Sequence, residues 1–104
     1  QNTDGNYVKP TSKNGSAGLA GIKLDAYNTG TDTNPSGANA YPISTLTWVL
    51  AYASGNRDNT PALKKTFAYM LSNKAQSQAP SLGYVPLPSS IRKISLAAVQ
   101  KIAN

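Results

Sequence analysis

The 104-residue chain contains no cysteine, no histidine and no glutamate. Without cysteine there is neither a disulfide nor a thiolate metal site, and without histidine the commonest general base and metal ligand is missing. A Ser-His-Asp or Cys-His catalytic arrangement is therefore excluded. We expect a protein that is not an enzyme and that uses no metal and no cofactor.

Long hydrophobic runs are also missing. The most apolar stretch, residues 46–53 (LTWVLAYA), is too short to cross a bilayer. No signal-like segment is present, so an exported protein would carry its signal outside these residues. Hydrophobic residues make up 39% of the chain, which is low for a domain that must build its own core. We expect a thin core.

The net charge of +6 is unevenly distributed. In residues 1–40 lysines and aspartates balance, so the whole excess lies in residues 41–104. Dispersed lysines on helix backs are usually a solvated face rather than a binding site. The aromatic residues Trp48, Tyr52 and Phe67 stand in core-type positions, and the basic residues do not cluster with exposed aromatics, so no nucleic-acid partner is expected.

The chain divides into two unlike parts. Residues 1–40 are crowded with Gly, Asn, Thr, Ser and Asp, which favour turns. Within them, Ser12 to Ile22 could form a small helix, although three glycines weaken it. Residues 41–104 have more regular patterns.

The second part predicts one strand and two helices. The apolar, β-branched and aromatic run Leu46 to Tyr52 suits an interior strand with Trp48 substantially buried. After a turn at residues 54–59, Thr60 is the expected cap of a helix over residues 61–73. A last helix is predicted over residues 90–102, capped by Ser89 or Ser90.

Each predicted helix carries one apolar stripe, which is typical of a core-facing surface. The stripes comprise Leu63, Phe67, Met70 and Leu71 in the first helix, and Ile91, Ile94, Ala98, Val99 and Ile102 in the second. Between the helices, Leu82 to Pro88 is predicted to be extended, because two prolines oppose helix.

Two short motifs suggest chemistry only weakly. Residues 90–93 match S-x-x-K, but the companion motifs of that enzyme class are absent. The glycines between Gly15 and Gly21 lack both G-x-G-x-x-G and the Gly-Lys-Ser/Thr ending of a P-loop. We interpret the first as a helix start with a surface lysine and the second as a poor helix.

Several segments together resemble the C-terminal end of a known family. They are Gly5-Asn6-Tyr7-Val8-Lys9-Pro10-Thr11, Ala40-Tyr41-Pro42-Ile43-Ser44-Thr45-Leu46-Thr47-Trp48-Val49-Leu50, residues 60–71 and Leu82-Gly83-Tyr84-Val85-Pro86-Leu87-Pro88. The chain is similar along nearly its whole length to the phosphate-binding proteins of bacterial ABC transporters, which are type II periplasmic binding proteins.

The resemblance implies an α/β fold: the C-terminal portion of a two-lobed binding protein that closes on inorganic phosphate, with one apolar strand, packed helices and a loop-rich N-terminal segment. Residues 1–40 would end the second lobe, and residues 41–104 would return to the first. Tyr41, Pro42 and Ile43 would form the crossover, or hinge, between lobes. The family's phosphate contacts come from earlier in its chain, so no phosphate ligand is assigned here.

The resemblance also implies the partners and the location. They are the remainder of the parent binding protein, phosphate in the complete protein only, and the permease of the ABC transporter, in the periplasm or at the cell surface. The alternative is a free-standing basic interaction module that binds a protein or an anionic polymer.

Overall fold

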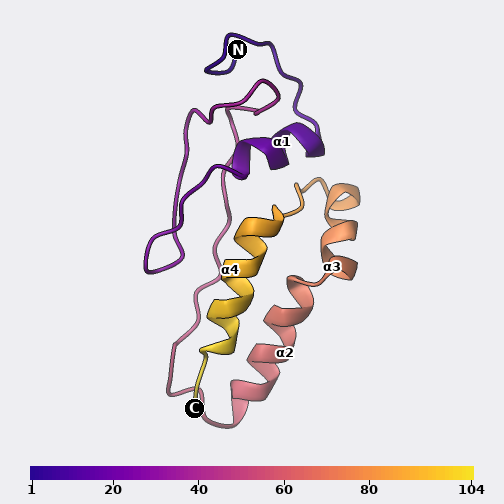
Figure 1. Ribbon diagram of the computed structural model, residues 1–104. Helices are drawn as coiled ribbons and strands as arrows, with labels where there is room; N and C mark the ends of the chain where they lie inside the picture. The colour runs from indigo at the N-terminus through magenta and orange to yellow at the C-terminus, as the bar shows by residue number, and fades with distance from the viewer.

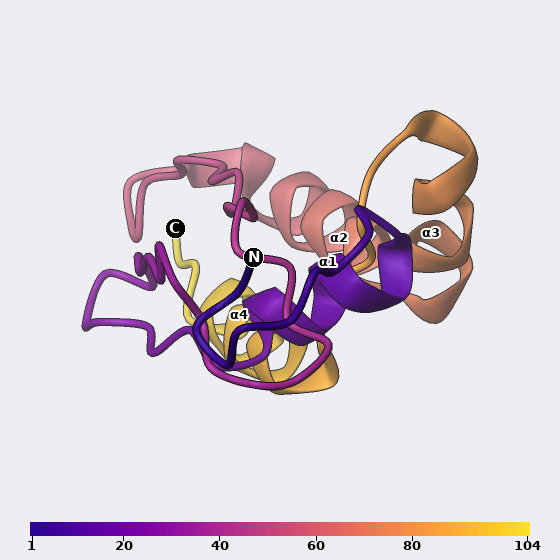
Figure 2. The same ribbon diagram turned by 90° about the horizontal axis from the view of Figure 1, so that it is seen from above.

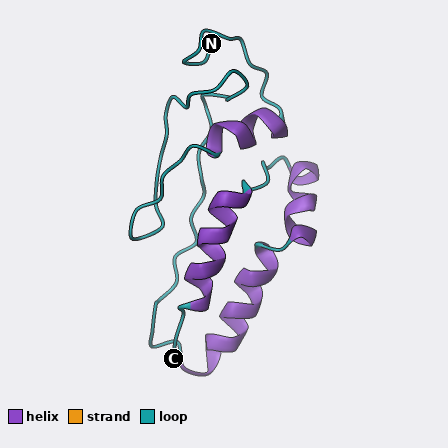
Figure 3. Ribbon diagram, viewed as in Figure 1, coloured by secondary structure: helices purple, strands orange, loops and turns teal.

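The computed structural model describes residues 1–104 and is helical, without any strand (Figures 1 and 3). Its elements are α1 (Ser12–Leu19), η1 (Arg57–Asn59), α2 (Thr60–Met70), α3 (Asn73–Gln78), η2 (Ala79–Leu82) and α4 (Ser89–Gln100), where η marks a 3-10 helix. The expectation of an α/β fold is therefore wrong for this chain.

An irregular segment takes the place of the expected strand. We call residues Ile43–Tyr52 the lateral segment, because they run alongside α4 toward the C-terminus (Figure 1). A strand needs a second backbone to pair with, and the chain supplies none. Trp48 is 41% exposed and Tyr52 is also exposed, so the predicted burial of Trp48 and the core position of Tyr52 are wrong too.

The two long helices form close to the predicted positions. The first begins one residue early, because the 3-10 turn η1 continues directly into α2 and Thr60 is already helical. Its hydroxyl donates to the carbonyl oxygen of Arg57 at 3.0 Å. The cap of α4 is Pro88, with no side-chain hydrogen bond, rather than Ser89 or Ser90. Each of the two helices therefore starts one residue before its predicted start, α2 at Thr60 instead of residue 61 and α4 at Ser89 instead of residue 90.

The first helix of the second part ends three residues before the predicted end at residue 73, and a separate short helix follows it. α2 ends at Met70, and Ser72 then adopts an extended conformation and caps α3, accepting from the backbone N–H of Ala75 at 3.2 Å. Leu82 closes η2 instead of starting an extended run, and Gly83 follows with a positive φ of 80°. Residues 84–88 are non-helical as predicted.

One small cluster joins the parts of the chain. Leu19 of α1, Ile22, Leu46 of the lateral segment and Ile91 of α4 are buried together. α1 lies across the N-terminal end of α4, and α2 packs along α4 (Figure 1). Seen from above, α1 is drawn over α4, and a loop of the N-terminal part extends on the side away from α3 (Figure 2). None of these helices combines the length and the hydrophobicity of a membrane-spanning segment.

The molecule is elongated and thin. Its extents are 51 × 29 × 16 Å, and its radius of gyration is 15.3 Å, against about 13 Å for a compact domain of this length. It exposes 7346 Å², whereas a compact monomer of 10.9 kDa exposes roughly 5,600 Å². The thin core expected from composition is confirmed, since 12 of 104 residues are buried.

Two leucines of the lateral segment test this description. Leu46 is buried in the cluster, whereas Leu50 is 93% exposed. We expect Leu46→Ala to lower the free energy of unfolding by about 2 kcal/mol, because it removes apolar contacts and leaves a cavity. The matched control Leu50→Ala should change it by less than about 0.5 kcal/mol. Urea unfolding followed by Trp48 fluorescence measures both, and equal effects would contradict the packing.

Candidate functional site

Of the predicted crossover residues Tyr41, Pro42 and Ile43, the first is held against α1. The backbone N–H of Tyr41 donates to the carbonyl oxygen of Asn14 at 3.1 Å, and the hydroxyl of Ser44 donates to the carbonyl oxygen of Tyr41 at 3.2 Å. Tyr41 and Pro42 are half-buried, whereas Ile43 is exposed. The chain therefore leaves the N-terminal part after Pro42 and becomes solvent-exposed at Ile43.

Glycines of α1 permit this close approach. A Cβ atom on Gly18 would lie 2.5 Å from the carbonyl oxygen of Tyr41 and 3.4 Å from the hydroxyl of Ser44. A Cβ atom on Gly15 would lie 2.8 Å from a methyl group of Val85. Both glycines are buried. The interpretation of this stretch as merely a poor helix is therefore incomplete, because its glycines form the face on which two distant segments pack.

A buried asparagine ties the N-terminus to the turn before the crossover. The side-chain amide of Asn2 donates to the carbonyl oxygens of Gly37 at 2.8 Å and Ala38 at 3.2 Å. Its side-chain oxygen accepts from the backbone N–H groups of Asn6 at 2.9 Å and Asp4 at 3.1 Å. Asn2 is 6% exposed, so water cannot satisfy its side-chain amide, and these hydrogen bonds do so instead.

Asp25 organises the loop after α1. Its carboxylate accepts from the backbone N–H groups of Tyr27 and Thr29, both at 2.9 Å, and from the hydroxyl of Thr29 at 2.8 Å. The backbone N–H of Thr29, followed by its hydroxyl, lowers the pKa of Asp25 from its ordinary value of 3.8, because these donors favour the charged form.

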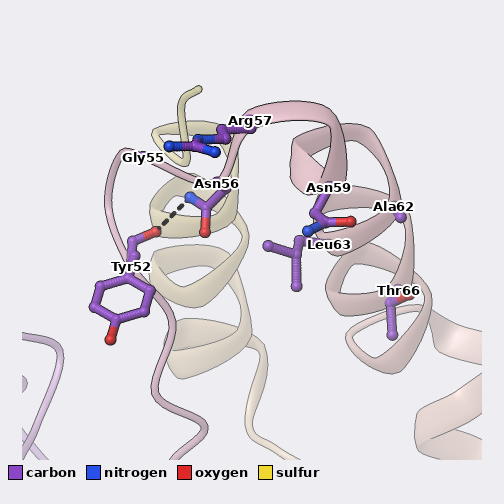
Figure 4. Close-up of a pocket in the computed structure, with 8 residues that line it drawn as sticks. All are labelled: Tyr52, Gly55, Asn56, Arg57, Asn59, Ala62, Leu63 and Thr66. Carbon is purple, nitrogen blue, oxygen red and sulfur yellow. Dashed lines mark hydrogen bonds between the residues drawn. The ribbon is translucent and has the colours of Figure 1, made fainter.

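A surface cavity of about 450 Å³ opens between the end of the lateral segment and α2 (Figure 4). Its lining residues are Tyr52, Gly55, Asn56, Arg57, Asn59, Ala62, Leu63 and Thr66. Arg57 is the one charged side chain among them. The side chain of Asn56 does not face the cavity with free donors, since it donates to the carbonyl oxygens of Tyr52 at 2.9 Å and Ala103 at 3.0 Å. The amide of Asn56 is therefore already used, and Arg57 is the one cation that the cavity offers to an anion.

The carboxylates and S-x-x-K residues do not form a reactive centre. Asp32 accepts from the backbone N–H of Asn34 at 3.2 Å within a turn, and Asp4 accepts from that of Gly37, also at 3.2 Å, which links the N-terminus to a distant loop. No group of three or more potential metal ligands comes together. Ser90 and Lys93 are both exposed on α4.

Two anchoring residues were missed by the sequence analysis. The anchoring role of Asn2 cannot be recognised in the sequence, because its partners at residues 37–40 are far away along the chain. Gly18 gave a signal that was misread: glycines at positions 15 and 18 lie on one helical face, and that spacing is compatible with a close contact. The sequence alone does not show which backbone approaches it.

The sequence is similar to that of a known protein. No family model matches the chain. A phosphate-binding protein PstS from Methanocaldococcus jannaschii is 28% identical over 115 residues, an alignment that spans 98% of this chain and 30% of that protein. The chain is thus similar to a PstS protein along almost all its length, and it spans less than a third of the length of that curated relative.

The first prediction from the site concerns Gly18. Gly18→Ala should lower the free energy of unfolding by about 1–3 kcal/mol, because its Cβ atom would clash with the backbone of Tyr41. The matched control is Gly21→Ala, whose Cβ atom would meet only the carboxylate of Asp32 at 3.8 Å. Urea unfolding measures both variants, and a Gly18→Ala variant as stable as Gly21→Ala would rule out the close contact.

Acid should weaken the loop that Asp25 organises. Because the pKa of Asp25 is lower in the folded loop, its hydrogen bonds contribute stability above the ordinary pKa of 3.8, and this contribution is lost as pH falls through the folded value. Carboxylate chemical shifts followed by NMR should titrate below pH 3.8 for Asp25. The amide signals of Tyr27 and Thr29 should move with the same midpoint in the native chain, and Asp25→Asn should abolish that movement. A midpoint at or above 3.8 would contradict the loop geometry.

Proposed function

We propose that this chain is the C-terminal part of a solute-binding protein that captures inorganic phosphate for uptake by an ABC transporter. The observation that carries the proposal is the similarity to PstS over 98% of the chain but only 30% of that relative. In this role the chain performs no chemical reaction, and its partners are the rest of its parent protein and the transporter permease. The protein acts in the periplasm or at the cell surface.

The contribution of these residues is structural. The cavity beside Arg57 offers an anion a single cation, Asp25 and Asp32 stabilise local turns, and Asp4 links the N-terminus to Gly37. Phosphate recognition in water needs several charge-assisted hydrogen bonds directed at one point. The phosphate ligands are therefore assigned to the remainder of the parent protein, while Tyr41, Pro42 and Ile43 provide the crossover.

The thinness of the chain supports the same role. A stable protein with so few buried residues would need disulfides, a metal or a partner. The chain has no cysteine and no metal-ligand cluster, so a partner is the remaining means of stabilisation. A longer protein provides that partner covalently.

Phosphate titration of two proteins tests the proposal. The full-length protein, encoded by the complete reading frame that contains these codons, should bind phosphate saturably, with Kd of about 1 μM or tighter, in calorimetry at physiological ionic strength. The isolated 104-residue chain should show no saturable site, because its +6 charge attracts anions only through screened, non-specific forces.

Sulfate titrated into both proteins is the control for non-specific anion binding. A complete protein that does not bind phosphate would refute phosphate capture. A saturable phosphate site on the isolated chain would refute the assignment of the ligands to the remainder.

A further inference from the structure

Arg57, beside the cavity between the lateral segment and α2, has a backbone conformation that is rare for arginine. Its φ angle is 50°, in the left-handed region that residues with bulky side chains seldom adopt. Its direct neighbours Asn56 and Asp58 are of types that adopt this region more readily, yet the left-handed residue is the arginine. Such backbone outliers gather at ligand sites, where the surrounding structure holds them in place.

Hydrogen bonds on both sides hold the backbone of Arg57. Its carbonyl oxygen accepts from the hydroxyl of Thr60 at 3.0 Å and from the backbone N–H of the same residue, which is buried. On the other side, the amide of Asn56 donates to the carbonyl oxygens of Tyr52 and Ala103. The guanidinium is therefore carried by a fixed turn, and a ligand that pairs with it has less backbone to order.

The cavity has the size and the lining of a small-molecule site. Its volume of about 450 Å³ lies within the range of roughly 300–1,000 Å³ that is usual for ligand pockets. Tyr52, Ala62 and Leu63 provide apolar surface, and Figure 4 shows Leu63 pointing from α2 into the space between the two segments. No carboxylate lines the cavity, since Asp58, the only acidic residue of the second part, is not among its lining residues. The lining therefore leaves the charge of Arg57 available to an anion.

We propose that this cavity binds a small carboxylate that has an apolar body. The guanidinium of Arg57 pairs with the carboxylate, whose two oxygens match its planar donors, and the apolar body lies between Tyr52 and Leu63. A single cation suits the single charge of a carboxylate, whereas a phosphate dianion needs several donors and gains nothing from an apolar wall. The proposal does not depend on phosphate capture.

Titration of the full-length protein with phenylacetate tests the proposal. The amide signals of Arg57, Asn59 and Leu63 should move saturably in NMR spectra, with Kd of about 1 mM, because the ligand is small and makes one charged contact. The neutral isostere phenylacetamide should bind at least about 10-fold more weakly. Signals that do not move, or equal binding of the two compounds, would overturn the proposal. Movement that occurs in the isolated chain but not in the full-length protein would overturn it as well.

Two arginine variants of the full-length protein provide a matched pair. Arg57→Asn removes the cation but places a residue there that adopts a positive φ more readily, so the variant should unfold at no lower urea concentration than the native protein. It should weaken phenylacetate binding at least about 10-fold. Arg92→Gln lowers the net charge equally on α4, away from the cavity, and should leave the affinity unchanged. Equal losses of affinity in the two variants would overturn the proposal.

Free carboxylates and the C-terminus of a peptide share this chemistry, and a second titration separates them. If N-acetyl-Gly-Phe binds at least about 10-fold more tightly than phenylacetate, the site supports capture of a peptide C-terminus, whereas equal or weaker binding supports a free carboxylate. Phosphate should not move the same amide signals, and phosphate that competes with phenylacetate would overturn the proposal. A full-length protein that binds phosphate elsewhere but not phenylacetate would support the proposed function and overturn this site, and the opposite result would do the reverse.

Discussion

The packing of Leu46 between α1 and α4 is the contact on which the arrangement of the chain depends. Leu46 comes from the lateral segment, Leu19 from α1 and Ile91 from α4, and no other buried cluster joins these three elements. No hydrogen bond joins residues 1–40 to α2, α3 or α4. Apolar contacts, this cluster and that of Gly15 with Val85, therefore hold the N-terminal loops against the helical layer.

Polar contacts within the N-terminal part converge on the predicted crossover from several directions. Asn2 holds the turn at residues 37–40, Asn14 accepts from the backbone of Tyr41, and Gly18 allows that backbone to lie against α1. Tyr41 is thus held to the N-terminal part by its backbone, whereas Ile43 is exposed.

The sequence predicted the helices better than the fold class. The apolar stripes and Pro61 placed α2 and α4 within a few residues, because helical periodicity is a local property. The run from Leu46 to Tyr52 has the composition of an interior strand, yet pairing depends on a second backbone, and composition cannot show whether one is present. The same limit applies to the anchors. The partners of Asn2 and Gly18 lie more than 20 residues away, and only the three-dimensional arrangement reveals them.

The C-terminus gives the lateral segment a property that its exposure alone does not suggest. The backbone N–H of Ala103 donates to the carbonyl oxygen of Ala53 at 2.9 Å, and Asn56 bonds to the carbonyl oxygen of Ala103. The segment is therefore held at both ends, by the crossover at one and by the last residues of the chain at the other. Much of its conformational freedom is already lost before anything contacts it. Since ordering a flexible segment is a main cost of association, a surface held in this way can be covered with a smaller entropic penalty than a free tail of the same composition.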